Sequence, residues 1–407
     1  MGEKIELSKI KELSASDYDY LVKLRRDLHA HPELGLNEFR TAELIEHELD
    51  SFGIDYKRIG KTGVLGIIRG TSASAKSLAV LLRADIDALP VQEQNDVPYR
   101  SQTDGVMHAC GHDVHTASLL GAAKILSSLK NQFTGEIRLV FQPAEEIGKG
   151  AGDFISAGVL EGVSRVFGLH TAPDLPLGTV GVKPALNNAA VDQFKIHVKG
   201  KSSHVSAPQL GVDALYIASQ IVVALQAIVT RRTSPVEPVI IGVGKLNAGT
   251  TYNALAESAE LEGTTRTISN ESRGFIKQQV TNVVQQITAL YGGKVQIEWD
   301  EFCPVVYNDV AVTEEVKDVI DRVFGEGHTT RDRALSLGGD NFADFIQTVP
   351  GTYAYLGTSN EKKRGTLNPV HSVNFDVDED SLIYGSALYA SYALWFLSEG
   401  TYAGEKK

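Results

Sequence analysis

Four residues of types that commonly bind metal ions fall close together in the stretch Met-His-Ala-Cys-Gly-His-Asp-Val-His at 107–115. They are His108, Cys110, His112 and His115. A thiolate and an imidazole two positions apart, on a turn that contains glycine, can reach one metal ion or two adjacent ones, because both ligand types suit Zn²⁺ and similar ions. Taken alone, the stretch is equally compatible with the start of a helix whose histidines are buried and hydrogen-bonded.

Carboxylates and a further histidine follow the predicted strands. Three short apolar runs have the composition of strands buried in a sheet that is covered on both faces: 78–82, 136–142 and 163–169. Potential metal ligands stand just after these runs, namely Asp85, Asp87, Glu145, Glu146 and His170. Ligands of open α/β sheets bind at the carboxyl ends of strands, so we expect these side chains to meet at one edge of the sheet.

The chain holds enough such residues for two metal ions and a catalytic base. Two ions about 3.5 to 4 Å apart need roughly three ligands each, with one shared between them. Five residues on four separate loops can meet that need: Cys110, His112, Glu146, His170 and His371. Amide hydrolysis also needs a group that takes a proton from water, and a carboxylate that is not a ligand suits this role. Glu145 and Glu146 offer one of each, and their positions alone do not decide which is which.

The hydrophobic pattern predicts an α/β domain interrupted by a smaller α+β domain. Helical spacing alternates with buried strands up to about residue 185, and the same pattern returns from about 301. Between 186 and 300 the predicted order is strand-helix-strand-strand-helix-strand, which is typical of a mostly antiparallel sheet with helices on one face. We therefore predict one domain formed by 1–185 and 301–407, and a second formed by 186–300.

Composition favours a soluble cytoplasmic protein. With 407 residues, the chain can bury a large core, and its two cysteines, Cys110 and Cys303, are far apart, as expected in a reducing compartment. Its N-terminal stretch has no apolar segment typical of a signal peptide, and we expect no membrane-spanning run. The formal charge of −12 opposes binding to nucleic acid or to an anionic membrane.

Several collinear motifs resemble one enzyme family. The strings are HAHPELG, RADIDALP, MHACGHDVHTA, FQPAEE, GLH, GKSSHVSAP, GTTRT and PVHSVNFDVDE. They are similar to the amidohydrolase branch of the di-metal aminoacylase/carboxypeptidase family, which includes hippurate hydrolases, plant auxin-conjugate hydrolases and bacterial N-acyl-amino-acid deacylases. The resemblance implies an α/β catalytic domain of the di-metal exopeptidase type, with an inserted ferredoxin-like α+β domain that serves as a lid and forms a homodimer or higher homo-oligomer.

The resemblance also implies a role for each site residue. Cys110 would bridge two divalent metal ions, Zn²⁺ or Mn²⁺, and the remaining ligands would be His112, Glu146, His170 and His371. Glu145 would be the general base, and Asp85 would orient the ligands without binding metal. In the lid, His204 would stabilise the oxyanion across the dimer, and Asn253 and Arg266 would bind substrate. Without the resemblance, these three lid residues read as ordinary surface residues.

Two departures from the family pattern concern the substrate pocket. Gln209 stands where many relatives have a second histidine. Gly339-Asp340-Asn341-Phe342 stands where many have Ser-Glu-Asp-Phe. Neither departure removes a predicted metal ligand, but the shape of the acyl or side-chain pocket is left open.

The resulting hypothesis is a metal-dependent hydrolase that cleaves the amide bond of N-acyl amino acids, through water activated by the metals and a glutamate base. A dipeptidase or carboxypeptidase on the same scaffold is the near alternative. A non-catalytic binding relic would not need the base, and a structural zinc module would have a closed site with four ligands and no spare carboxylate. The sequence does not identify the acyl group, the amino acid or the physiological metal, although a thiolate ligand favours Zn²⁺.

Overall fold

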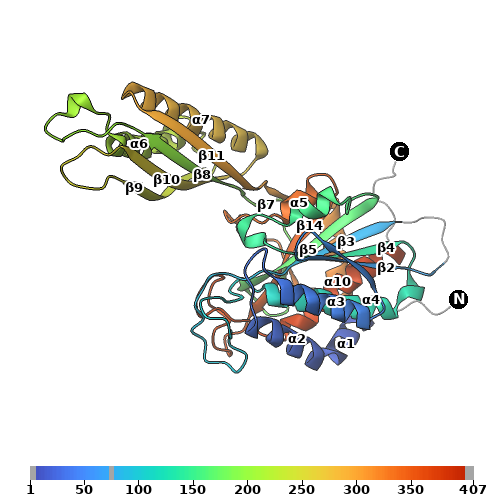
Figure 1. Cartoon of the computed structure of the whole chain (residues 1–407). Coiled ribbons are helices and arrows are strands. Elements are labelled where there is room, and N and C mark those ends of the chain that lie inside the picture. The colour runs from blue at the N-terminus through green and yellow to red at the C-terminus, as the bar shows by residue number, and fades with distance from the viewer. Residues whose placement is uncertain (1–5, 73–77, 399–407) are drawn as a thin grey trace, which may run out of the picture. The chain divides into compact units, whose positions relative to one another are not determined.

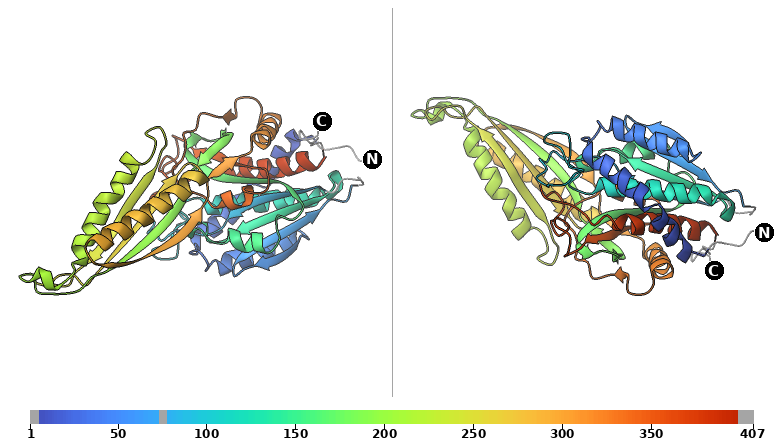
Figure 2. Two further views of the ribbon diagram at one scale, coloured as in Figure 1. Left: turned by 90° about the horizontal axis from the view of Figure 1, so that it is seen from above. Right: turned by 90° about the horizontal axis from the view of Figure 1, so that it is seen from below.

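The structure, a computed structural model, describes residues 6–72 and 78–398. The chain forms two compact units (Figures 1 and 2). Unit 1 contains the chain up to Asn187, Tyr307–Ala334 and the chain from Asp340, and unit 2 contains Asn188–Val306 and Leu335–Gly339. Unit 2 is therefore longer than the predicted 186–300, because its last strand continues to Cys303 and a short segment returns to it later. That the two units are independent domains stays a prediction.

Unit 1 is built on an eight-stranded mixed sheet. Its strands, in chain order, are β1 (Asp55–Ile59), β2 (Gly63–Arg69), β3 (Ala79–Asp85), β4 (Glu136–Gln142), β5 (Val163–Pro176), β6 (Val180–Gly181), β13 (Thr329–Thr330) and β14 (Gly351–Ser359). The spatial order is β1-β2-β4-β3-β5-β14-β6-β13. The four central strands β4, β3, β5 and β14 run parallel, so their carboxyl ends meet at one edge of the sheet.

Helices cover both faces of this sheet. They are α1 (Ser8–Ser16), α2 (Tyr18–Ala30), α3 (Phe39–Ser51), α4 (His112–Ser128), α5 (Ala151–Ser156), α8 (Val310–Phe324), α9 (Phe342–Ile346) and α10 (Ser381–Ser398), with short 3₁₀ turns η1 (Lys130–Gln132) and η2 (Glu145–Ile147). Successive residues of a strand face opposite sides. On β5, Phe167 contacts Tyr389 of α10, whereas Gly168 lies against Phe342 of α9. The helices α10 and α9 therefore pack on opposite faces.

Unit 2 has a four-stranded antiparallel sheet with two helices on one face. Its elements are β8 (Ala190–Lys199), η3 (Pro208–Leu210), α6 (Ala214–Arg231), β9 (Ile240–Ala248), β10 (Ser258–Thr267), α7 (Asn270–Leu290) and β11 (Lys294–Cys303). The strand order is β11-β8-β10-β9. Phe194, Ile196 and Leu261 are buried beneath the helices, while Lys195 and Glu260 on the other face form an ion pair. A further two-stranded sheet joins β7 (Ala185–Asn188) to β12 (Val306–Asn308).

These architectures confirm the predicted fold class: an α/β catalytic part with an inserted, ferredoxin-like α+β part. The expectation that the chain has no run long and apolar enough to span a membrane needs correction. By length and composition, helix α6 is apolar enough to cross a membrane, and it is the single such helix among the described residues. Its buried side packs on the sheet of unit 2 through Ile217, Ile221 and Leu225. The apolar composition of α6 therefore also serves the core of this unit.

A cluster of buried charges ties α2 to α4 and to the loop before α10. The Arg25 guanidinium donates to Asp113 Oδ2 at 2.8 Å and to Asp376 Oδ1 at 3.0 Å. His29 Nδ1 lies 2.7 Å from Asp113 Oδ2, and its Nε2 lies 3.2 Å from Glu93 Oε1. Burial and the Arg25 charge lower the pKa of His29, but the Asp113 and Glu93 carboxylates outweigh them and raise it. The cluster therefore favours a protonated His29.

This raised pKa predicts how stability depends on pH. A group whose pKa is raised on folding stabilises the protein fully below its unfolded pKa, and that contribution is lost as the pH rises through the folded pKa. We expect His29→Gln to reduce the free energy of unfolding by about 1 to 3 kcal/mol near pH 6, and by progressively less at higher pH. Urea unfolding of both proteins across a pH series measures the difference.

The exposed His47 provides a matched control for this measurement, since its side chain is 79% accessible. His47→Gln should leave the free energy of unfolding close to wild type throughout the series. A His29→Gln effect that does not change with pH would contradict the assignment of a charged His29.

Candidate metal centre

The predicted ligands of unit 1 come together at the carboxyl edge of the parallel strands. Helix α4 begins at His112, directly after Gly111 and Cys110, while His170 lies on β5 and Glu146 on η2. His371 comes from the loop before α10, where its backbone N–H donates to Ala109 O at 2.7 Å. Residues more than 200 positions apart in the chain thus face one small volume.

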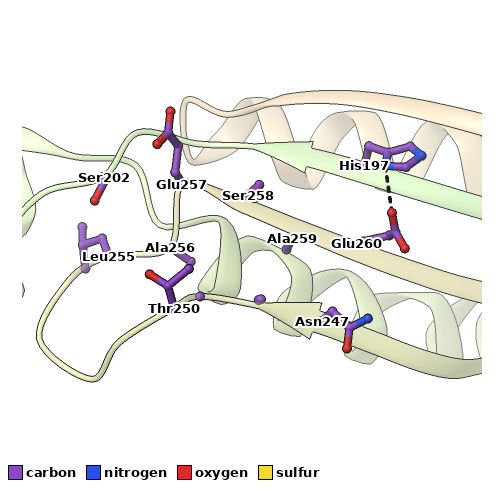
Figure 3. Close-up of a pocket in the computed structure, with 12 residues that line it drawn as sticks. His197, Ser202, Asn247, Thr250, Leu255, Ala256, Glu257, Ser258, Ala259 and Glu260 are labelled. Carbon is purple, nitrogen blue, oxygen red and sulfur yellow. Dashed lines mark ion pairs between the residues drawn. The ribbon is translucent and has the colours of Figure 1, made fainter.

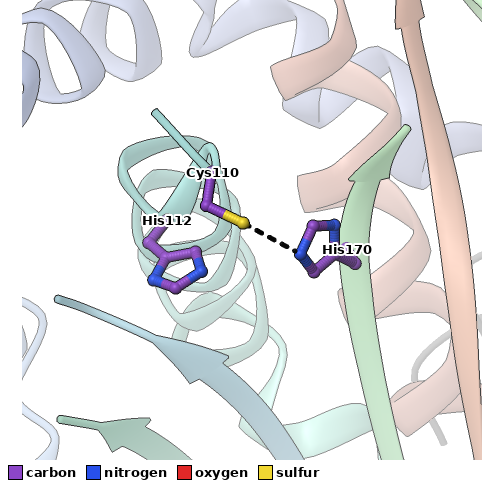
Figure 4. A group of neighbouring side chains, drawn as sticks. All are labelled: Cys110, His112 and His170. Carbon is purple, nitrogen blue, oxygen red and sulfur yellow. Dashed lines mark hydrogen bonds between the residues drawn. The ribbon is translucent and has the colours of Figure 1, made fainter. Parts of the chain in front are cut away.

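The ligand atoms form two triads that share one sulfur. Cys110, His112 and His170 make one triad, and Cys110, Glu146 and His371 make the other, with the atoms of each triad within 4.8 Å of one another. Cys110 Sγ lies 3.4 Å from His170 Nε2 (Figure 4). His371 Nε2 lies 3.5 Å from Glu146 Oε1. A shared thiolate between two sets of ligands is the arrangement that a dinuclear site requires.

Several buried polar atoms at this position have no hydrogen-bond partner within the described residues. They are both ring nitrogens of His112, Oε1 of Glu145 and Oε1 of Glu146. His112 Nδ1 lies 3.3 Å from Asp87 Oδ1, although the ring is not aligned for a hydrogen bond. Buried polar atoms are nearly always satisfied in native proteins, because desolvation without a partner is costly. A divalent cation would satisfy one ring nitrogen of His112 and the Glu146 oxygen, so these residues fit a metal centre.

The two adjacent glutamates differ in their electrostatic surroundings. Burial raises the pKa of Glu145, and the carboxylates of Asp340 and Glu146 raise it further. Burial also raises the pKa of Glu146, but contacts with His371 and His112 outweigh this and lower it. Glu146 therefore faces the imidazoles of the site, whereas Glu145 sits beside another carboxylate. This difference supports a ligand role for Glu146 and a proton-transfer role for Glu145.

Two aspartates support the site in different ways. Asp85, predicted to orient the ligands, lies 2.5 Å from His115 Nδ1 through Oδ1, and its Oδ2 lies 3.7 Å from His112 Nε2. Asp87 accepts hydrogen bonds from the backbone N–H groups of both Glu145 and Glu146, each at 3.0 Å. The sequence signal for Asp87 was its place two residues after Asp85 at the same strand end, but its role was not predicted.

The other two histidines of the 107–115 stretch lie outside the two triads. His108 is buried, neither of its ring nitrogens has a hydrogen-bond partner among the residues that the structure describes, and burial lowers its pKa to about 3. His115 could join Asp85 and His112 in a third group of potential ligand atoms. Its Nδ1, however, is already bonded to Asp85, and its Nε2 accepts the backbone N–H of Thr171 at 2.8 Å.

Two of the three predicted lid residues lie together. The backbone N–H of Val205 donates to Asn253 O at 3.1 Å, which brings the loop of His204 against the loop of Asn253. His204 Nδ1 accepts the backbone N–H of Ser206 at 3.1 Å, so the ring proton belongs on Nε2. Both side chains are exposed. His204 therefore presents an N–H donor, as an oxyanion partner must.

Arg266 lies at the other end of β10. It pairs with Val191, close to the start of unit 2, whereas Asn253 precedes the first residue of β10, Ser258. Arg266 lies eight positions after Ser258 along the strand, or roughly 26 Å at about 3.3 Å per residue. No carboxylate pairs with the Arg266 side chain in the described ranges, and burial lowers its pKa. Within unit 2, Arg266 therefore lies far along the strand from His204 and Asn253, although all three were predicted to act in the lid.

Unit 2 also has a hollow of about 540 Å³ beside the loop that follows β9 (Figure 3). Its lining includes His197, Asn247, Glu257 and Glu260, and His197 Nδ1 lies 3.4 Å from Glu260 Oε2. None of the potential metal-binding groups found among the described residues lies here. The candidate catalytic site is therefore the pair of triads that share Cys110, and not this hollow.

Comparison with known proteins agrees with this geometry. Residues 81–395 match peptidase family M20/M25/M40. An N-acetyl-L-cysteine deacetylase of Bacillus subtilis is 41% identical over 90% of this chain and 85% of its own length. Thermostable carboxypeptidase 1 of Saccharolobus solfataricus is 39% identical over 93% of this chain and 95% of its own. The crystal structure of the Bacillus subtilis YXEP protein, a dinuclear metal-binding M20 peptidase, is 36% identical, with a TM-score of 0.79 over 94% of this chain and 99% of its own.

Substitution of the two glutamates separates ligand from base. Glu146 lies within 4.8 Å of the Cys110 and His371 ligand atoms, whereas Glu145 groups with His112 and Glu146, outside the two triads that share the sulfur. We therefore expect Glu146→Gln to weaken metal binding at least as much as losses outside the coordination sphere do, by about 10- to 100-fold. We expect Glu145→Gln to keep its metal content and to lose about 10²- to 10⁴-fold in kcat. Elemental analysis together with steady-state kinetics decides between them. Equal loss of metal in both variants would contradict the separate roles.

Proposed function

Because the chain belongs to peptidase family M20/M25/M40 and is a metal-dependent amidohydrolase, we propose that it cleaves the amide bond of N-acyl amino acids. The products are a carboxylate and a free amino acid. The identity to a deacetylase that acts, by its name, on N-acetyl-L-cysteine supports a small acylated amino acid as substrate.

One observation carries the proposal: two triads of ligand atoms share Cys110 Sγ, and a buried carboxylate outside both triads, Glu145, stands beside them. Cys110 would bridge two metal ions, with His112 and His170 completing one set and Glu146 and His371 the other. A structural metal site would be closed by four ligands and would have no use for Glu145.

Different residues of the protein would transfer the proton and stabilise the negative charge during the reaction. Two divalent cations in such a site supply Lewis-acid charge that eases ionisation of water and polarises a carbonyl. Glu145 takes one proton of the attacking water and returns it to the amide nitrogen as the C–N bond breaks. His204 donates its Nε2–H to the oxygen of the acyl carbonyl as negative charge develops there, and Asn253 beside it contributes to substrate binding.

We infer that Zn²⁺ is preferred over Mn²⁺, since a thiolate is a soft ligand. Both cysteines are buried thiols that are not joined in a disulfide, which supports a reducing, cytoplasmic environment. The net charge of −12 opposes binding to nucleic acid and to anionic membranes, so we propose neither as a partner.

A panel of substrates tests the reaction class. Metal-loaded protein is assayed for release of free amino acid from N-acetyl and N-benzoyl amino acids, and from dipeptides with free and blocked amino termini. We expect the acylated amino acids to be preferred. The 39% identity to thermostable carboxypeptidase 1 supports a second candidate, peptide hydrolysis, which a preference for the dipeptides would establish instead.

Arg266 is the candidate group for the substrate carboxylate, because its half-buried guanidinium has no carboxylate partner in the part of the chain that the structure describes. A guanidinium binds a carboxylate through two parallel hydrogen bonds, which lysine cannot reproduce. We expect Arg266→Ala to reduce kcat/KM for an N-acyl amino acid by the equivalent of about 2 to 5 kcal/mol, and to affect the matching methyl ester much less.

The control for this variant is Arg231→Ala, which removes an exposed arginine at the end of α6 in the same unit. Metal content is compared in all proteins. An equal loss on the acid and on the ester would mean that Arg266 supports the fold and does not bind the carboxylate.

The separation of the lid residues supports a homodimer whose sites are shared. Substrates of this size cannot reach both Arg266 and the His204–Asn253 pair if these lie roughly 26 Å apart along one strand. A second copy would supply one of them. Two features of unit 2 offer surfaces for association: the exposed apolar side chains of α6, Leu215, Tyr216 and Val223, and the outer edge of β9, which ends the strand order of the sheet.

Mixing of inactive variants tests this sharing. Glu145→Gln and His204→Ala homodimers should each be inactive. After unfolding together and refolding, half of the dimers are mixed, and each mixed dimer has one site with an intact Glu145 and an intact His204 from its partner. We expect recovery of roughly a quarter of wild-type activity, as random pairing in a two-fold dimer gives. No recovery, with mixed dimers demonstrated by differently tagged chains, would show that His204 acts within its own chain.

A further inference from the structure

Thr171 lies at the point where the two segments that carry Cys110 and His170 meet. It follows His170 on β5, and its side chain is buried at 1% exposure. A Cβ atom on Gly111 would come within 2.5 Å of Thr171 Oγ1. Gly111 itself has a left-handed φ of 86°. The turn between Cys110 and His112 therefore rests directly on the Thr171 side chain, with no room for a larger residue.

Each polar group of Thr171 is bonded to a different part of the site. Its hydroxyl donates to Cys110 O at 2.8 Å. Its carbonyl oxygen accepts His170 Nδ1–H at 2.7 Å. Its backbone N–H donates to His115 Nε2 at 2.8 Å. One residue thus uses all three of its hydrogen-bonding groups on the segments that carry the ligands.

These bonds determine which ring nitrogens are free. A carbonyl can only accept, so the His170 proton lies on Nδ1 and the lone pair of Nε2 faces Cys110 Sγ. At His115 the situation differs, because Nε2 accepts the Thr171 N–H and Nδ1 is left to donate to Asp85 Oδ1. His170 is therefore held in the tautomer that a ligand needs, whereas both nitrogens of His115 are occupied.

We propose that Thr171 is a positioning residue of the dinuclear centre: its hydroxyl fixes the Cys110 backbone and its carbonyl fixes the His170 ring, so that sulfur and Nε2 are aligned before metal binds. This role rests on the proposed ligand set, which Thr171 supports without binding metal itself. His115 serves in this arrangement as a link between Thr171 and Asp85 and is not a ligand.

A pair of conservative substitutions isolates the hydroxyl. Thr171→Val keeps the shape of the side chain and removes the bond to Cys110 O, while Thr171→Ser keeps the bond. The control is Thr358→Val on the neighbouring strand β14, because Thr358 is fully buried and its hydroxyl has no hydrogen-bond partner among the described residues. Loss of a buried threonine hydroxyl as such is thereby separated from loss of this bond.

The measurements are metal affinity, by titration with Zn²⁺ against a competing chelator, and the absorption of the Co²⁺-substituted protein, whose thiolate-to-cobalt band reports on Cys110. We expect Thr171→Val to bind metal about 10- to 100-fold more weakly and to have a weakened or shifted band. Thr171→Ser should remain close to wild type in both measurements. Thr358→Val should also be unchanged.

Equal affinity and an equal cobalt spectrum in Thr171→Val and Thr358→Val would overturn the proposal. If Thr171→Val does not fold, the comparison of Thr171→Ala with Thr171→Ser measures the same hydroxyl on a smaller side chain, and equal metal binding by these two would overturn it as well. Neither readout uses a substrate. Metal-loaded wild type that fails to hydrolyse N-acyl amino acids would therefore contradict the proposed function and leave the role of Thr171 standing.

Discussion

A guanidinium with no exposed surface, that of Arg83 on β3, holds together the strand ends on which the site is built. It donates to Asp85 Oδ2 at 2.6 Å, to Gln142 Oε1 at 2.9 Å and to Asn341 Oδ1 at 3.2 Å. Removal of one partner from a buried charge pair costs about 3 to 5 kcal/mol, because the other charge is left desolvated. The position of Asp85, and through it that of His115 on α4, therefore depends on Arg83.

One of the two departures from the family motifs, Gly339-Asp340-Asn341-Phe342, contributes side chains to this buried cluster. Asp340 approaches Arg83 to 3.2 Å and accepts a hydrogen bond from the Tyr353 hydroxyl, and Asn341 Oδ1 accepts a hydrogen bond from the Gln142 amide at 2.6 Å. The sequence left open an effect of these two positions on the substrate pocket. In the structure their side chains belong to the polar cluster beneath the strand ends. Gln209, the other departure, is an exposed residue of η3.

Local patterns predicted the elements, but contacts between distant segments decided the site. Apolar runs and strand-end carboxylates are local features, so β3, β4 and β5 and the residues that follow them were visible in the sequence. Helix α4 begins at His112, inside the 107–115 stretch, because Gly111 in the left-handed region ends the preceding turn there. The roles of Thr171 and Asp87 could not be predicted from the neighbouring sequence, since their hydrogen-bond partners lie about 60 positions away. Arg25 and Asp376, 351 positions apart, show the same limit.

The adjacent glutamates show how backbone geometry separates two identical side chains. Ala144 has a left-handed φ of 59°, which is unfavourable for a residue with a Cβ. Three bonds hold it there: Glu38 Oε1 accepts the Ala144 N–H at 2.8 Å, and Asp87 accepts the N–H groups of Glu145 and Glu146. The chain then enters η2, where successive side chains point in different directions. Glu146 is turned towards His371, and Glu145 is left beside Asp340 with one oxygen unpartnered within the described residues. Backbone strain held by two buried carboxylates, and not residue type, therefore distinguishes the proposed ligand, Glu146, from the proposed base, Glu145.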